Sequence, residues 1–247
     1  MNDARRLSFD DVVEAYDRLR PGYPAAMYDA VFALAPPGRV VEVGCGTGKA
    51  TRALLARGCT VLAAEPGPRL AAFARRTLDA ARFRVVETDF EALEVEGTVD
   101  FVWAAQSWHW VGPDGFRRAH ELLEPRGRLV LVWNRPVRSS VNLQPAYDAA
   151  YGDDAGSPPG PIDAEVAEHA AEITDSGWFD APRIVRAPWT SAHSAAGYTA
   201  LMDTWSPVRA LGEAKPAFLA HVRRLIDDAA GTIRRDLECV AFVARPL

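Results

Sequence analysis

The sequence has few cysteines and no long apolar run. Its 247 residues include three cysteines, Cys45, Cys59 and Cys239, which lie far apart without a CxxC pair. So sparse a set predicts neither a disulfide framework nor a zinc site and is typical of a reducing cytosol. No stretch approaches the roughly 18 apolar residues of a membrane span, and residues 1–20 lack the apolar centre of a signal peptide. We therefore expect a cytoplasmic protein without a membrane partner.

An excess of positive charge is also missing. Lys and Arg number 28 against 33 Asp and Glu, which gives a formal net charge of −5. Phosphate binding usually requires a basic surface, so we expect no nucleic-acid partner. No group of histidines and carboxylates has the spacing of metal ligands, so we expect no metal. The length suits one sizeable α/β domain, and we interpret residues 1–247 as a single domain that is a monomer or a homodimer.

Short apolar runs alternate with helical patterns as far as Asn134. Strands are predicted at residues 39–43, 61–65, 83–87, 99–106 and 127–134. Pro24 opens a predicted helix that Pro36-Pro37-Gly38 ends, and further helices are predicted at residues 49–57, 68–79 and 114–123. Strands that alternate with helices in this way pair in parallel through right-handed crossovers. This pattern predicts an α/β fold with a mostly parallel sheet.

The pattern loosens after Asn134. Residues 136–161 are rich in Pro, Gly, Asp and Ser, and we expect an exposed, mobile connection there. A helix at 163–175, a strand at 182–190, one or two helices across 198–230 and a strand at 235–245 follow. We interpret residues 39–134 as a cofactor-binding core, 1–24 as an N-terminal cap, and 136–162 with 194–230 as lid or acceptor segments.

The most informative segment is the glycine-rich turn after the first strand, Glu42-x-Gly44-x-Gly46-x-Gly48. A strand that enters a helix through glycines leaves main-chain N–H groups free and lets a ligand approach the backbone. A phosphate-binding loop would need Ser or Thr after Gly48-Lys49, where Ala50 stands. A dinucleotide fingerprint would need its third glycine where Lys49 stands, which weakens a nicotinamide-dependent oxidoreductase as an alternative without excluding it.

This turn, with an acid two residues before its first glycine, resembles the first motif of class I S-adenosylmethionine (AdoMet)-dependent methyltransferases. Two further segments are similar to the small-molecule branch of that family, methyltransferase type 11, which includes trans-aconitate methyltransferase-like enzymes. They are residues 16–24 (YDRLRPGYP) and the Trp-His-Trp run at 108–110. The resemblance covers residues 9–134. It implies AdoMet as cofactor and a Rossmann-like, mostly parallel seven-stranded sheet with helices on both faces and a helical lid.

A carboxylate at the end of the second strand, Glu65, is placed to accept the ribose hydroxyl hydrogens, unless it is merely a solvated acid. The resemblance implies that the glycine turn packs on the methionine part of AdoMet. It also implies that an acid at Asp89 accepts from the adenine amino group, with Glu87 and Glu91 as alternatives for a similar place. Tyr16 and Arg20 either contact the ligand or form a purely structural cap. The complete expected cofactor set is Tyr16, Arg20, Glu42, Gly44, Cys45, Gly46, Gly48, Glu65, Pro66, Asp89, Phe90, Gln106 and Ser107.

Trp108, His109 and Trp110 follow the fourth strand, at the edge of the sheet where ligands of open parallel sheets bind. His109 is either a general base or a histidine that orients the acceptor. The tryptophans pack the acceptor, face the cationic sulfonium or belong to the core. The Asn-Pro-Pro-aromatic motif of nucleic-acid methyltransferases is absent, so we expect a small-molecule acceptor, aromatic and flat or a carboxylic acid. A non-catalytic AdoMet-binding module remains an alternative.

Overall fold

One mixed sheet forms the body of the molecule. The computed structural model describes residues 13–152 and 162–247, in which seven strands lie in the order β3-β2-β1-β4-β5-β7-β6. β1 to β5 are parallel, and β7 runs antiparallel to both β5 and β6. This arrangement confirms the predicted Rossmann-like sheet. The strands are β1 (Arg39–Val43), β2 (Thr60–Ala64), β3 (Phe83–Val86), β4 (Val99–Ala105), β5 (Leu123–Ser139), β6 (Arg183–Ser194) and β7 (Thr232–Ala244).

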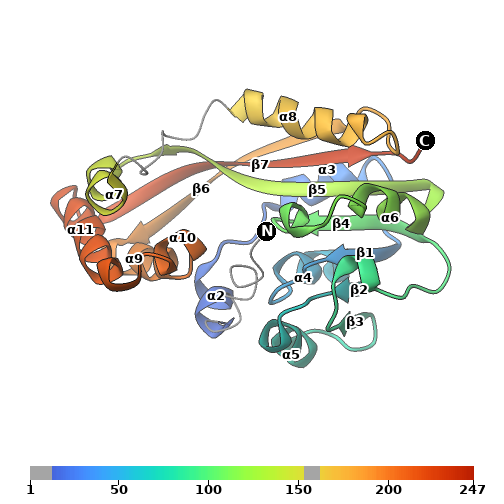
Figure 1. Cartoon of the computed structure of the whole chain (residues 1–247), viewed down its shortest axis with the longest axis horizontal. Coiled ribbons are helices and arrows are strands. Elements are labelled where there is room, and N and C mark those ends of the chain that lie inside the picture. The colour runs from blue at the N-terminus through green and yellow to red at the C-terminus, as the bar shows by residue number, and fades with distance from the viewer. Residues whose placement is uncertain (1–12, 153–161) are drawn as a thin grey trace.

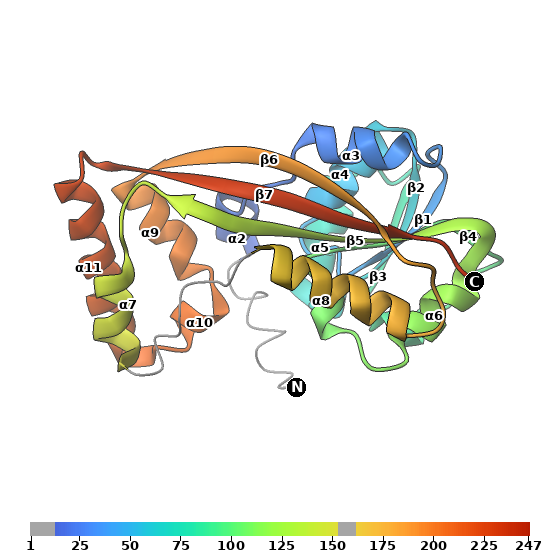
Figure 2. The same ribbon diagram turned by 90° about the horizontal axis from the view of Figure 1, so that it is seen from above.

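Helices cover both faces of this sheet, as Figures 1 and 2 show for α3 and α4 on one face and α8 on the other. The described helices are α2 (Val13–Leu19), α3 (Ala25–Phe32), α4 (Lys49–Ala56), α5 (Pro68–Thr77), α6 (Gly115–Leu122), α7 (Gln144–Tyr151), α8 (Ile162–Asp175), α9 (Ala195–Asp203), α10 (Ser206–Arg209) and α11 (Lys215–Asp228). Among these helices none combines the length and the apolar character that a bilayer crossing requires.

Alternate strand residues divide the main core into two layers. Val40, Phe101 and Trp103 point to the face that α3, α4 and α5 cover, where the Tyr28 and Trp103 rings stack 5.6 Å apart. Val41 and its neighbours on β4 and β5 point to the other face, against α6 and α8. The buried strands are apolar on both faces because helices cover both, as is usual for parallel sheets. This packing fixes the carboxyl ends of β1, β2 and β4 along one edge.

The long strands β5, β7 and β6 extend beyond β1 to β4, and α7, α9, α10 and α11 gather at their far end (Figure 1). These helices share an apolar cluster of their own, which includes the buried side chains of Tyr198, Phe218 and Val222. In Figure 1, α2 lies between this helical end and the parallel strands. The N-terminal segment therefore lies near both parts of the molecule.

Two predictions about the second half were wrong. Part of the expected mobile connection at 136–161 is regular: β5 continues to Ser139 because it pairs with β7 along its whole length, and α7 follows. Leu143 and Ala146 anchor α7 in the apolar cluster, and residues 153–161 lie outside the described part. Residues 198–230 contain parts of three α-helices rather than one or two. Prolines in the first turns of α10 and α11 start new helices there.

Candidate functional site

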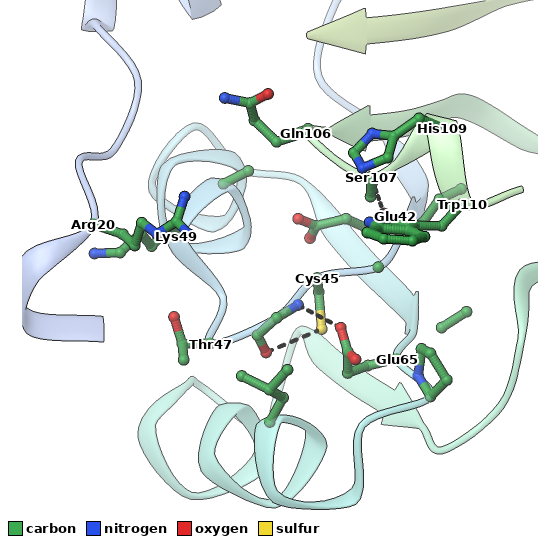
Figure 3. A pocket seen from close by; sticks show the side chains of 18 of the residues that line it. Arg20, Glu42, Cys45, Thr47, Lys49, Glu65, Gln106, Ser107, His109 and Trp110 are labelled. Carbon is green, nitrogen blue, oxygen red and sulfur yellow. Dashed lines mark hydrogen bonds between the residues drawn. The ribbon is translucent and has the colours of Figure 1, made fainter. Parts of the chain in front are cut away.

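A cavity of about 400 Å³ opens at the carboxyl ends of β1, β2 and β4. Its wall comes from the glycine turn after β1, the ends of the neighbouring strands, residues of the N-terminal segment and the start of α10. β1 lies between β2 and β4 in the sheet, and the strand order reverses at this point, because β2 and β3 lie on one side of β1 while β4 and β5 lie on the other. Open α/β sheets bind their ligands at such a switch point. Figure 3 shows the side chains that converge on the cavity.

The three glycines of the turn all adopt left-handed φ angles of 63°, 57° and 83° at Gly44, Gly46 and Gly48. A Cβ at Gly44 would lie 2.8 Å from Ser107 Cβ, and one at Gly48 would lie 2.5 Å from Leu78 Cδ1. A Cβ at Gly46 would meet no protein atom within 4 Å, although Gly46 lines the cavity. Gly44 and Gly48 thus permit the turn to pack, whereas Gly46 leaves space for a ligand against the backbone.

Glu65 follows β2 and is buried beside the turn. Its carboxylate accepts hydrogen bonds from Gly46 N at 2.7 Å and from Gly67 N at 2.9 Å, as Figure 3 shows for the first of these. The main chain therefore aims this acid into the cavity and balances part of its charge. This position agrees with the prediction from the strand-end location.

Glu42 lies under the turn and is 1% exposed. The Thr51 hydroxyl donates a hydrogen bond of 2.6 Å to its Oε2 atom. The pKa of Glu42 is raised from 4.5 to about 7. Burial is the main cause, the hydrogen bond from Thr51 acts in the opposite direction, and the negative charge of Glu65 adds to the rise. The cavity therefore has an acid in its floor that exchanges a proton near neutral pH.

The N-terminal segment contributes Tyr16, Arg20 and Tyr23 to the wall. Arg20 donates from Nε to Thr204 Oγ1 at 2.9 Å and from Nη2 to the Thr204 carbonyl at 3.0 Å. Its guanidinium also lies over the Tyr16 ring, 5.1 Å from the ring centroid. Arg20 therefore joins the N-terminal segment to Thr204, the residue that precedes Trp205, and so links two parts of the cavity wall.

Gln106 follows β4 in a left-handed conformation with φ of 61°, which is unusual for a residue other than glycine. Its main-chain N–H donates to Val132 O, and its side chain lines the cavity. Ser107 Oγ donates to Val43 O, which ties this segment to the end of β1. Backbone strain of this kind persists where the surrounding structure holds it and is frequent at functional sites.

The Trp-His-Trp run forms a 3-10 turn, Trp108–Trp110, in which two of the three rings face the cavity and one is buried in the core. His109 and Trp110 line the cavity, with ring centroids 4.7 Å apart. Trp108 does not line it, because its ring is buried against Phe90 and Phe116, so the expectation that Trp108 contacts an acceptor is wrong. Desolvation lowers the pKa of His109, and the positive charge of Arg135 lowers it further.

The other predicted residues gather as expected, with one exception. Fourteen of the sixteen line the cavity, and besides Trp108 only Gly48 does not, since it starts α4 and packs on Leu78 instead. Sequence reasoning missed several wall residues, namely Thr47, Lys49, Asn134, Trp205, Ser206 and Pro207. Thr47 and Lys49 lie within the recognised turn, and Trp205, Ser206 and Pro207 lie within the predicted lid or acceptor segment 194–230, although no local pattern singled out these residues. Within residues 13–152 and 162–247, no group of three or more His, Cys, Asp or Glu side chains has an arrangement that would hold a metal ion.

Comparison with known proteins identifies related sequences for this region. Residues 41–131 match the model of a family described as a methyltransferase domain. The chain is 40% identical over 129 residues to an uncharacterized methyltransferase of Mycobacterium tuberculosis, and the alignment covers 52% of each protein. The chain thus spans about half the length of the first curated relatives that it matches. It is 29% identical over 229 residues to a trans-aconitate 2-methyltransferase of Methylobacterium nodulans, covering 83% of this chain and 84% of the relative.

Solved structures share the complete fold. A protein from Anaeromyxobacter dehalogenans, assigned as a type II methyltransferase, superposes with a TM-score of 0.68 at 21% identity over 92% of this chain and 97% of its own. An AdoMet-dependent methyltransferase from Thiobacillus denitrificans, solved with S-adenosylhomocysteine, superposes with a TM-score of 0.55 at 14% identity over 96% and 97%. At these identities the likeness shows the fold alone.

Proposed function

We propose, from the match of residues 41–131 to the methyltransferase domain family, that this chain transfers a methyl group from AdoMet to a small-molecule acceptor. Its fold is that of class I AdoMet-dependent methyltransferases. The observation that carries the proposal is the cavity in which the glycine turn and the Glu65 carboxylate face the same space. We also propose, from the net charge and the sparse cysteines, a cytoplasmic protein, monomeric or homodimeric, with no nucleic-acid partner.

Two features of the cavity fit AdoMet. The Thr47 hydroxyl is buried at the wall and has no hydrogen-bond partner among the described residues. Buried polar atoms without a partner are rare in proteins, so a ligand atom is a reasonable partner for it. The space in front of Gly46 would be filled by a Cβ and suits a ligand that packs on the main chain. The residues present therefore fit a nucleoside with a polar amino-acid tail.

The sheet order assigns each part of the wall a role in this proposal. Glu65, with Pro66 beside it, would hold the ribose, and Asp89 with Phe90 would hold the adenine at the end of β3. Glu42 and the glycine turn would contact the amino-acid end, together with Lys49 from α4. Residues 13–24 and the segment that ends in α10 would cap the site, and we retain 136–162 and 194–230 as proposed lid or acceptor segments.

When bound, AdoMet supplies an electrophilic methyl group on a sulfonium sulfur. The protein must then position an acceptor in line with that methyl group, exclude water and take up a proton where the acceptor releases one. Desolvation and the charge of Arg135 lower the pKa of His109, which favours the neutral imidazole, and a neutral imidazole nitrogen accepts a proton. We propose that His109 is the general base that takes the acceptor's proton.

Calorimetric titration of the purified chain with AdoMet, S-adenosylhomocysteine and NADH tests the cofactor proposal. We expect heat from the first two and none from NADH. Gly46→Ala should abolish binding because its Cβ occupies the ligand space. Gly177→Ala is the matched control, since Gly177 also has a positive φ and an open Cβ position but lies away from the cavity. Equal AdoMet affinities in the two variants would contradict the assignment, and AdoMet binding without turnover on any acceptor would favour a binding module.

A further inference from the structure

The wall of the cavity has two chemically different ends. Toward β2 and β3 it carries acids, namely Glu65, Asp89 and Glu91. Toward β5 and α10 it is formed by Tyr23, Gln106, His109, Asn134, Trp205, Ser206 and Pro207. This second set, which we call the β5 end of the cavity, contains no Lys, Arg, Asp or Glu among the residues that the structure describes. Since the nucleoside is assigned to the β2 and β3 end, the acceptor is left with the β5 end.

The two cations that line the described cavity wall already bind other groups. Lys49 Nζ donates to the Asp17 carbonyl at 2.6 Å, and Asp17 Oδ1 lies 4.0 Å from the same nitrogen. Arg20 donates hydrogen bonds from Nε and Nη2 to Thr204. Figure 3 shows both cations together on the side of the cavity away from His109 and Trp110. In the proposed function they face the amino-acid end of AdoMet, whose own carboxylate would take any remaining donor.

The next cation beyond the wall is also paired. Arg135 follows Asn134 on β5, and it forms a salt bridge with Glu165 of α8 rather than lining the cavity. Asn134 itself donates from Nδ2 to Gly22 O at 3.0 Å and accepts from Trp189 Nε1 at 3.2 Å. The side chain of Gln106, whose Nε2 atom also donates to Asn134 O at 3.4 Å, and the hydroxyls of Tyr23 and Ser206 are the remaining neutral polar groups that can face an acceptor.

We infer that the acceptor is an uncharged planar aromatic molecule that carries a hydroxyl or amine group, and that carboxylate acceptors are excluded. This inference rests on the proposed function and narrows it. The rings of Tyr23, Trp205 and His109 offer flat apolar faces, while the neutral polar groups provide hydrogen bonds without a countercharge. A carboxylate placed at the β5 end would lose its water, while the neighbouring cations Arg20 and Arg135 already bind Thr204 and Glu165, which is strongly unfavourable. The chain should thus differ in acceptor from its trans-aconitate 2-methyltransferase relative.

Calorimetry on the full chain saturated with S-adenosylhomocysteine tests this inference with three probes, 2-naphthol, 2-naphthoate and trans-aconitate at pH 7.5. The first two share a ring system and differ in charge. We expect 2-naphthol to bind at least about tenfold more tightly than 2-naphthoate, and trans-aconitate to give no heat. Ser206→Arg places a cation at the β5 end and should move the ratio of the two naphthyl affinities toward 2-naphthoate by about tenfold or more. Ser206→Gln is the neutral control and should leave the ratio unchanged.

Each outcome bears on a separate claim. Equal or tighter binding of 2-naphthoate or trans-aconitate, with S-adenosylhomocysteine bound, would overturn the acceptor class and leave the methyltransferase proposal intact. Failure of all three probes to bind would also overturn it, because an aromatic site should retain 2-naphthol. Absence of heat from S-adenosylhomocysteine itself would remove the proposed function and this inference with it. A ratio that Ser206→Arg does not change would show that α10 is not part of the acceptor wall.

Discussion

Replacing Glu65 with Gln changes one atom of the side chain at the point where the turn and the ligand meet. Both carboxylate oxygens accept main-chain N–H groups, from Gly46 and Gly67. The amide NH₂ of Gln cannot accept a hydrogen bond, so one of these contacts must become a clash between two donors. A hydrogen bond to a charged group contributes about 1.5–3 kcal/mol. We expect the free energy of unfolding to fall by about this amount.

Binding of S-adenosylhomocysteine should suffer as well, because the ribose hydroxyls lose an ionised acceptor. A loss of about 1.5–3 kcal/mol corresponds to a dissociation constant about 10- to 150-fold larger. Urea unfolding measures the free energy of unfolding. Calorimetric titration, under conditions in which the variant is fully folded, measures the dissociation constant of S-adenosylhomocysteine. Glu87→Gln is the control, since Glu87 is an exposed acid at the end of β3 that does not line the cavity. An affinity of Glu65→Gln within threefold of the wild type would refute the role of this carboxylate.

Four further outcomes follow from His109, Glu42 and Gln106. His109→Ala should lower turnover by about a hundredfold or more if His109 is the base, and a loss below about threefold would remove it from that role. Burial and the charge of Arg135 lower the pKa of His109, so the acidic limb of the rate–pH profile should lie below pH 6.5. This limb should move to higher pH in Arg135→Gln, and a limb that does not move would contradict the role of Arg135. The pKa of Glu42 is raised from 4.5 to about 7, so the folded state holds a proton that the unfolded state releases, and stability falls as pH rises from 4.5 to 7. Urea unfolding should therefore show Glu42→Gln gaining up to about 3 kcal/mol over the wild type between pH 5 and pH 8, and a difference that does not vary with pH would disprove the shift. Gln106→Gly should remove the left-handed strain and raise the melting temperature by about 2–4 °C in thermal unfolding, whereas a decrease would contradict the strain argument.

The parallel half of the fold and most of the cofactor wall could be predicted from the sequence because their determinants are local. Apolar runs, helix starts and the glycine turn each lie within about ten residues, and strand ends place Glu65 and Asp89 at one edge. Proline, glycine and polar residues after Asn134 indicated an exposed connection, but β5 continues to Ser139 because it pairs with β7. Tertiary pairing overrides local composition in such a segment.

Contacts between distant segments explain the remaining differences. Trp108 follows the same strand as His109, and the 3-10 turn alone directs its ring into the core instead of the cavity. Trp205 lines the cavity because it lies among the helices α7, α9, α10 and α11 at the far end of β6 and β7, and because Thr204 accepts hydrogen bonds from Arg20 of the N-terminal segment. Neither the direction of a ring after a strand nor a contact across 184 residues leaves a periodic pattern in the sequence.

A crystal structure of the chain with S-adenosylhomocysteine tests the central claim most directly. We expect the ligand in the cavity after β1, with both ribose hydroxyls within hydrogen-bond distance of Glu65 and its amino-acid end against Gly46. A ligand bound elsewhere, or a dinucleotide ordered in that cavity, would contradict the assignment.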